Sequence, residues 1–490
     1  VFHLPGSLLL AMFEDMKLKP PAGVAAGTPQ PPQNVKAIIS DKSVIIQFDP
    51  PLNFREAQVS NYEVKNIQTG DILNVKESPV IFTGLKNGSR YTFSVSATNS
   101  LGTSNSVNTN AVMPEVSWKT TIIDNAADAK HLATATYAGK PVIAYSDSKN
   151  GDLKLATFSG NKWSVKTVDG NSATLNKTTN DVSGYISMCT SVSGKKSYLH
   201  IFYADLKDKD LRYALYDGKD WYYEIVDGDA PAIQDYKEFP RVRGGSDVSV
   251  SSACAVNTSG VQVFYRDESQ GILLGAVKDG NEWRYEIVDG DKDTEDRTTG
   301  DVAFHLKALV DGNKTYVLYD SVLAIDQNRD ATSGEIRLAT RTTFDPGAWQ
   351  FKTLESPTAD ATILGYDVEI AKTAKGIIAS WFSATALSMP DPTLLRTFNL
   401  STASGVSTTS TSNYGTPNEL LSSDSKTLLF NCLGRLCAID YAKFSKGQSA
   451  IALASSWQST EPIASAWIVL NKVRYAVAGI NGKVVLLKAA

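Results

Sequence analysis

The stretches WYYEIVD at residues 221–227 and WRYEIVD at residues 283–289 differ at one position and lie 62 residues apart. Three more stretches share their outline, a Trp followed six residues later by an acid: WKTTIID at 118–124, WSVKTVD at 163–169 and WQFKTLE at 349–355. Successive Trp residues are 45, 58, 62 and 66 positions apart, the length of four short strands and a variable loop. This recurrence indicates a repeat architecture.

Three further strand-like runs accompany each Trp stretch, for example YISMCTSVSG, YLHIFYAD and DLRYALYDG ahead of residues 221–227. Two later units lack the Trp, and the final unit has only three runs. Residues 118–124 have no partner runs of their own and supply the missing strand. We therefore expect an all-β fold in which residues 115–490 form a β-propeller of seven blades, closed by one blade shared between both ends of the repeats. Because the last units are degenerate, six or eight blades are the alternatives.

Residues 31–114 show short alternating strands separated by turn residues, the pattern of a β-sandwich. This region strongly resembles a fibronectin type III domain. The resemblance assigns Tyr62 to the Tyr-x-Val strand and Leu85–Tyr91 to the tyrosine corner, with Phe48 in place of the usual core Trp. No Arg-Gly-Asp sequence is present, so integrin binding is not implied. The resemblance implies a spacer or docking module.

The repeat unit also resembles a known family through its Tyr-x-Asp, Asp-Leu-Lys-Leu-Ala and Trp … Val-Asp segments. It is similar to repeats of secreted bacterial and archaeal propellers and, more distantly, to fungal fucose-lectin and sialidase-type propellers. The resemblance implies the fold and leaves the ligand open. A sialidase needs an arginine cluster and Asp-box repeats, which only residues 146–151 loosely match. We expect a non-catalytic protein, with a glycan-cleaving enzyme as the weaker alternative because many Asp residues could supply two carboxylates.

The repeated residues have two interpretations. The Trp side chains either pack between neighbouring blades or serve as sugar-stacking platforms. The acids that follow a Tyr either bond the backbone of their own turn or coordinate a ligand or calcium. These acids are Asp147, Asp205, Asp267 and Asp320, and the structural repeat is made of Trp118, Trp163, Trp221, Trp283 and Trp349.

Long loops are expected on one face of the propeller, at residues 170–181, 228–246, 290–300 and 322–334, whereas the hairpins of the other face are short. Loops on a rigid scaffold carry function, and their acids, arginines and aromatics suit a polar ligand such as a glycan. The candidate ligand-binding residues are Tyr236, Arg241, Arg243, Asp229, Asp291 and Asp326.

Residues 1–30 begin with the apolar run VFHLPGSLLLAMF and end in a Pro/Gly/Ala-rich linker. The run is too short to span a bilayer, so no membrane span is expected. It either packs on its own protein or makes a subunit contact, which predicts self-association through residues 1–20. The 48 basic and 52 acidic residues argue against a nucleic-acid partner.

Four cysteines are too few for a disulfide framework, and they are either buried thiols or bridges. Cys189 and Cys254 occupy similar positions in adjacent repeats, and Cys432 and Cys437 lie close in sequence. The scattered histidines exclude zinc-ligand spacing, so no cofactor is expected and calcium in the Asp-rich loops is left open. Five glycosylation sequons weakly favour secretion: Asn87, Asn176, Asn257, Asn313 and Asn399.

Together these patterns predict an extracellular or cell-surface recognition and adhesion protein, whose loop face binds a glycan or a surface protein. The main alternative is a structural subunit of an extracellular filament or surface layer, assembled through the N-terminal segment and the sandwich domain.

Overall fold

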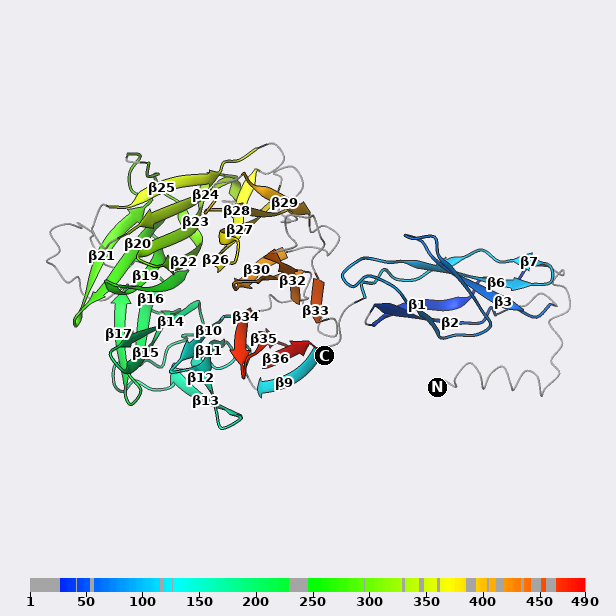
Figure 1. Cartoon of the computed structure of the whole chain (residues 1–490), viewed down its shortest axis with the longest axis horizontal. Coiled ribbons are helices and arrows are strands. Elements are labelled where there is room, and N and C mark those ends of the chain that lie inside the picture. The colour runs from blue at the N-terminus through cyan, green and yellow to red at the C-terminus, as the bar shows by residue number, and fades with distance from the viewer. Residues whose placement is uncertain are drawn as a thin grey trace. The chain divides into compact units, whose positions relative to one another are not determined.

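A computed structural model describes residues 27–40, 42–52, 57–114, 118–125, 127–228, 246–294, 296–327, 331–342, 348–358, 362–384, 394–402, 405–410, 418–432, 436–441, 451–454 and 464–489. The chain divides into two compact units, one made mainly of the residues before Trp118 and the other of those from Trp118 onward. Both units are built from antiparallel strands (Figure 1).

The first unit holds two sheets. The smaller has the order β1-β2-β5, and the larger has the order β4-β3-β6-β7 with β8 also paired to β6. The strands are β1 (Gln33–Ser40), β2 (Ser43–Asp49), β3 (Asn61–Asn66), β4 (Ile72–Val75), β5 (Val80–Phe82), β6 (Phe93–Asn99), β7 (Gly102–Thr103) and β8 (Val107–Asn108).

Alternate residues of these strands form the core of the first unit, because successive side chains of a strand point to opposite faces. Val44, Ile46 and Val64 are fully buried there. Phe48 is buried against Tyr62 with the ring centres 4.8 Å apart, so a Phe fills the core at this place. The hydroxyl of Tyr91 accepts a hydrogen bond from the backbone amide of Lys86, which ties the loop back onto the sheet.

The described part of the second unit contains seven four-stranded antiparallel sheets, each in chain order except the last. The first four are β10 (Leu132–Tyr137), β11 (Lys140–Asp147), β12 (Asp152–Ser159), β13 (Lys162–Asp169); β14 (Ile186–Ser193), β15 (Lys196–Asp205), β16 (Asp210–Tyr216), β17 (Trp221–Asp227); β18 (Ser252–Asn257), β19 (Gly260–Asp267), β20 (Ile272–Asp279), β21 (Glu282–Asp289); and β22 (Val302–Asp311), β23 (Lys314–Ile325), β24 (Ala331–Arg341), β25 (Gln350–Glu355).

The other three sheets are β26 (Ile363–Thr373), β27 (Gly376–Ala384), β28 (Leu394–Asn399), β29 (Ser407–Ser410); β30 (Asn418–Ser423), β31 (Thr427–Cys432), β32 (Leu436–Asp440), β33 (Ile451–Ala454); and β34 (Ser465–Leu470), β35 (Val473–Ile480), β36 (Lys483–Ala489), β9 (Trp118–Asp124). In the last sheet β36 pairs with β9, so strands from both ends of this unit share one sheet.

Neighbouring sheets meet through their first strands. β10 contacts β14, β14 contacts β18, and the series continues through β22, β26 and β30 to β34, which in turn contacts β10. The buried apolar clusters lie between sheets: one joins Phe202 and Leu211 to Val263 and Leu274 of the next sheet. Because a sheet packs against a neighbour on each side, its inner strands are apolar on both faces. Runs such as YLHIFYAD therefore do not alternate between apolar and polar residues.

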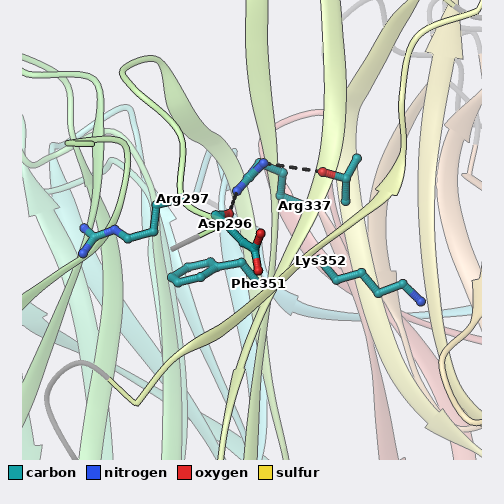
Figure 2. A pocket seen from close by; sticks show the side chains of 6 residues that line it. Asp296, Arg297, Arg337, Phe351 and Lys352 are labelled. Atoms are coloured by element: carbon teal, nitrogen blue, oxygen red, sulfur yellow. Dashed lines mark hydrogen bonds between the residues drawn. The ribbon is translucent and has the colours of Figure 1, made fainter. Parts of the chain in front are cut away.

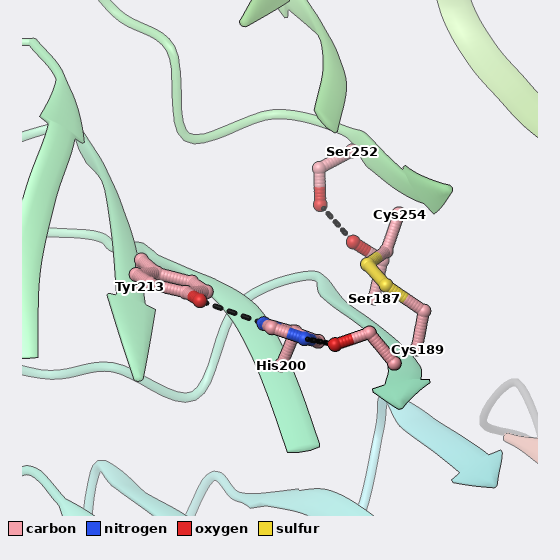
Figure 3. Close-up of a disulfide and its surroundings, with 7 residues drawn as sticks. Ser187, Cys189, His200, Tyr213, Ser252 and Cys254 are labelled. Carbon is pink, nitrogen blue, oxygen red and sulfur yellow. Dashed lines mark hydrogen bonds between the residues drawn. A yellow bond between two sulfur atoms is a disulfide. The ribbon is translucent and has the colours of Figure 1, made fainter. Parts of the chain in front are cut away.

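A disulfide joins Cys189 of β14 to Cys254 of β18, across the boundary between two neighbouring sheets (Figure 3). Beside it the hydroxyls of Ser187 and Ser252 are 2.9 Å apart. The side chains of Cys432 and Cys437 lie outside the described residues.

One expectation about the loops was wrong. Residues 322–334 were expected to form a long loop, but β23 and β24 extend through most of it, pairing Val322 with Gly334 and Ile325 with Ala331. The apolar residues of β23 continue far enough to hold the ladder, with register shifts near Ala324. Asp326 therefore follows the end of a strand in a long hairpin.

Candidate functional site

The acid that ends each Trp stretch forms a hydrogen bond across a sheet boundary. In four of the five, the carboxylate accepts a bond from the hydroxyl of a Tyr on the second strand of the next sheet, at 2.6–2.8 Å, whereas Glu355 accepts one from the indole N–H of Trp381 at 2.7 Å. The pairs are Tyr145 with Asp124, Tyr203 with Asp169, Tyr265 with Asp227, and Tyr319 with Asp289. Burial, followed by the nearby Asp169, raises the pKa of Tyr203 well above its usual value. These bonds hold adjacent sheets together, a role that the sequence did not reveal.

The repeated Trp side chains also contact the preceding sheet. The indole N–H of Trp283 donates to Glu224 at 2.8 Å, and that of Trp349 donates to Glu286 at 3.1 Å. Arg341 covers the ring of Trp349 at 4.2 Å and pairs with Glu286. With neighbours on their faces and edges, these rings are packing elements and not open platforms.

The two remaining described Trp residues of the repeat are covered as well. Trp163 packs on Phe158, with ring centres 5.2 Å apart. Trp221 stacks on Tyr216 and lies under the ammonium group of Lys166, 4.2 Å from the ring centre. The side chain of Trp118 lies outside the described residues.

The acids that follow a Tyr mostly organise their own turns. Asp205 accepts bonds from the backbone amides of Lys207 and Asp208, and Asp267 accepts one from Gln270. Asp147 instead pairs with Lys154 at 2.6 Å, and Asp320 accepts a bond from the amide of His305. No three His, Cys, Asp or Glu side chains converge to hold a metal ion within the described ranges.

Two of the loops between sheets are duplicates of each other. Residues 168–182 and 288–302 have equal length and share the pattern Val-Asp-Gly … Thr-Thr-x-Asp-Val. Asp169 accepts a bond from the amide of Thr178 at 2.9 Å, and Asp289 accepts the matching bond from Thr298 at 2.8 Å. Each loop is supported by its own arginine, at a matching position of the sheet that follows the loop.

These two arginines, Arg212 and Arg337, each donate to a loop carbonyl at 2.5 Å, that of Asn176 and Asp296 respectively. Arg337 also pairs with Asp289 at 3.0 Å. Asn176 and Asp296 both have a positive φ, 62° and 60°. Both residues therefore share the left-handed backbone conformation, and both are exposed.

The second copy lies beside a hollow of about 360 Å³, drawn in Figure 2. It is lined by Asp296, Arg297, Arg337, Phe351, Lys352 and Thr353. Figure 2 shows the charged ends of Arg297 and Lys352 directed to opposite sides, with Asp296 and Phe351 between them. Arg297 reaches the carbonyl of Ile287 and the carboxylate of Asp291, and Lys352 lies over Phe398.

The interior of the hollow combines an aromatic ring with an acceptor. The half-buried ring of Phe351 forms one wall. Within the described residues the carboxylate of Asp296 has neither a hydrogen-bond nor an ion-pair partner, because Arg337 bonds only its backbone carbonyl. The hydroxyl of Thr353 lies 3.5 Å from Arg337. An aromatic face beside an unpaired carboxylate suits the apolar face and the hydroxyl groups of a sugar ring.

The first copy of the loop has a different surface. The three positions of β25 that line the hollow, residues 351–353, correspond in the earlier sheet to Tyr223, Glu224 and Ile225. Arg297 corresponds to Lys177. Lys177 holds its ammonium group 5.8 Å from the ring centre of Tyr223. The ring that corresponds to Phe351 is therefore covered by a cation.

The structure describes two of the six candidate ligand-binding residues. Asp291 lies in the second copy of the loop and pairs with Arg297, next to the hollow. Asp326 lies beyond the end of β23. Tyr236, Arg241, Arg243 and Asp229 fall outside the described residues. Sequence reasoning missed Asp296, Phe351 and Thr353, although an alignment of residues 168–182 with 288–302 would have marked position 296.

Comparisons with known proteins confirm the resemblance of the first unit to a fibronectin type III domain. Residues 30–111 match the model of the fibronectin type III domain, so this unit is a fibronectin type III domain. The solved structure titled "Structure of FN3tt mut" is 19% identical over 17% of this chain and 94% of its own, with a TM-score of 0.15. A search of curated proteins gives no match.

Two solved structures overlap more of the chain. A complex of the Aleuria aurantia lectin with Fucalpha1-6GlcNAc is 13% identical over 68% of this chain and 96% of its own, with a TM-score of 0.38. The fucose-specific lectin of Aleuria aurantia is 10% identical over 78% of this chain and 95% of its own, with a TM-score of 0.35. At these scores the likeness does not extend to a binding site.

Proposed function

We propose that residues 118–490 form a seven-bladed β-propeller whose loop face binds a neutral glycan. The seven four-stranded sheets, the chain of first-strand contacts that returns from β34 to β10, and the pairing of β36 with β9 support the ring. The proposed protein is an extracellular recognition and adhesion protein. The disulfide supports an oxidising compartment, because such bonds persist mainly outside the cytosol.

The observation that carries the binding proposal is the unpaired carboxylate of Asp296 beside Phe351. A carboxylate accepts hydrogen bonds from two sugar hydroxyls, and the ring packs on the apolar face of the pyranose. The cations that line the hollow have other contacts, because Arg297 pairs with Asp291, Arg337 pairs with Asp289 and Lys352 lies over Phe398. The carboxylate of Asp296 is then the charge left to meet the ligand and disfavours uronic and sialic acids, so the proposed ligand is neutral. Binding occurs without turnover, and the fibronectin type III domain acts as the spacer that displays the propeller. No described helix has the length and apolarity needed to cross a bilayer.

A glycan array of the full chain, read with and without a calcium chelator, tests this proposal. We expect saturable binding to a related group of neutral glycans that is insensitive to the chelator. Asp296→Asn and Phe351→Ala should weaken binding about tenfold or more, which corresponds to roughly 1.4 kcal/mol. Lys177→Ala, in the duplicated loop, is the matched control and should bind as wild type. A flat array, or equal binding by Asp296→Asn, would overturn the proposal.

Assembly through residues 1–20 stays a prediction, because those residues lie outside the described ranges. Sedimentation of the full chain and of a variant lacking residues 1–20 measures it. The absence of turnover has its own measurement: bound glycans recovered after long incubation should be unchanged in mass.

A further inference from the structure

We propose that Asn176 and Asn313 carry N-linked oligosaccharides, whereas Asn257 and Asn399 do not. Four of the five sequons lie in the second unit, and the structure separates them by what their side-chain amides bond. The reacting atom of a sequon is the amide nitrogen Nδ2. Transfer can precede folding, so the separation follows from which of these nitrogens the folded chain leaves exposed and unbonded and can therefore carry a sugar.

Asn176 lies at the left-handed position of the first duplicated loop. Its side chain is exposed and makes no hydrogen bond within the described residues, because Arg212 bonds only its backbone carbonyl. The equivalent residue of the second copy is Asp296, which is exposed in the same left-handed conformation. Two independent copies of the loop thus expose the residue at this position, and the Asp removes the sequon from the copy that borders the hollow.

Asn313 lies in the turn between β22 and β23, after Gly312. It is exposed, and no hydrogen bond of its side chain occurs in the part of the chain that the structure describes. Thr315, the third residue of its sequon, is buried. Transfer to Asn313 therefore has to precede closure of the β22–β23 hairpin.

The other two amides are committed to the fold. Nδ2 of Asn257 donates to the hydroxyl of Thr315 in the neighbouring sheet at 3.1 Å, while its oxygen accepts from the amide of Ser259. Nδ2 of Asn399 donates to the carbonyl of Lys375 at 3.0 Å, and its oxygen accepts from Ser401. Both residues are half-buried, and a sugar on either nitrogen would have to displace the hydrogen bond that the nitrogen donates.

The modification is a group transfer from a lipid-diphosphate-linked oligosaccharide, supplied by the secretory pathway. Nδ2 attacks the anomeric carbon, a C–N bond forms, and the bond from that carbon to the phosphate oxygen breaks. The amide nitrogen loses one proton and the lipid diphosphate leaves. The product is a secondary amide that carries a large, solvated group at the surface.

The test is to secrete the full chain from a cell line that glycosylates Asn-x-Ser/Thr sequons and to map the occupied sites by mass spectrometry. Cleavage by an amidase in heavy-oxygen water converts each carrier Asn into a labelled Asp. We expect label at Asn176 and Asn313 and none at Asn257 or Asn399. Asn176→Gln and Asn313→Gln should each remove one oligosaccharide mass, and the matched control Asn257→Gln should remove none.

Label at Asn257 or Asn399, or its absence from Asn176, overturns the proposal. A co-secreted glycoprotein shows that the cells are competent, so absence of all label counts against it. The glycan-binding proposal is tested separately, on protein made without glycosylation. Failure of one therefore leaves the other standing.

Discussion

Four of the five repeated Trp residues have a charged residue three positions later, and the sign of that charge follows its partner in the next sheet. Glu224 meets the ammonium of Lys278, and Glu286 meets the guanidinium of Arg341. Lys166 takes the corresponding place one sheet earlier, where the next sheet offers the rings of Tyr216 and Trp221. A buried carboxylate requires a cation, whereas a lysine over an aromatic ring does not require an anion. The two charge patterns are therefore alternative ways to fill one boundary between sheets.

Removal of one Tyr hydroxyl tests the bond between sheets. Tyr203→Phe leaves the fully buried Asp169 without that donor, and we expect a loss of about 1.5–3 kcal/mol, the range for hydrogen bonds to charged groups. Urea unfolding of the second unit measures the loss. Tyr222→Phe, on an exposed ring of β17, is the control and should change stability by less than about 0.5 kcal/mol. Equal stability of the two variants would contradict the assigned role.

His200 predicts a pH dependence of stability. Its ring nitrogens lie 2.7 Å from the hydroxyl of Tyr213 (Figure 3) and 2.8 Å from that of Ser191. Burial lowers the pKa of His200 from 6.5 to about 4. The unfolded chain keeps the ordinary pKa, so between these values it binds more protons than the folded chain. The free energy of unfolding must then fall as pH falls from about 6.5 toward 4. Burial lowers the pKa of His131 to about 4 too, with the same sign.

Urea unfolding of His200→Gln at several pH values measures this contribution. The variant should be less stable overall but should show a shallower slope between pH 4 and 6.5. An unchanged slope would assign the acid sensitivity to other groups.

At the scale of elements, strands with a specific marker could be predicted from sequence. The Trp stretches locate β13, β17 and β21, and the Tyr62 and Tyr91 motifs locate the fibronectin type III strands. The extended β23–β24 hairpin was missed because the polar residues after Ile325 suggested a loop, although tertiary pairing decides such cases. The hollow was missed because its six residues come from a loop and two strands that are distant in sequence. Only their packing brings Asp296 to Phe351.

The bridge between β14 and β18 gives an element-scale prediction. Cys189 and Cys254 enclose a separation of 65 residues, so their replacement by Ser should cost about 2–5 kcal/mol, because the unfolded chain regains conformational freedom. Non-reducing urea unfolding measures the loss. Reduced wild type should match the double variant, and reductant should leave the variant unchanged. A double variant as stable as oxidised wild type would show that the bridge adds nothing to this boundary.

At the scale of the whole second unit, stability depends on the sheet made from both of its ends. Strand β9 has β36 as its partner, with Thr121 opposite Leu486. A chain that ends after Gly482 lacks β36, and we expect its second unit to lose its cooperative unfolding transition, while the fibronectin type III domain unfolds as before. A chain that ends after Lys488 is the control. Differential scanning calorimetry distinguishes these outcomes, and an intact transition of the second unit in the shorter chain would refute the dependence.

The same shared sheet can form only after the last strand, β36, has been synthesised. About 360 residues separate β9 from β36, and at roughly 5–20 residues per second a ribosome needs about 20–70 s to make them. Throughout that interval β9 has no strand partner, so its backbone hydrogen-bonding groups are exposed while the sheets that follow it in the chain are being made. A chaperone that shields such an edge would raise the yield, and every prematurely terminated product would keep the edge exposed, a mark by which quality control can recognise an incomplete chain.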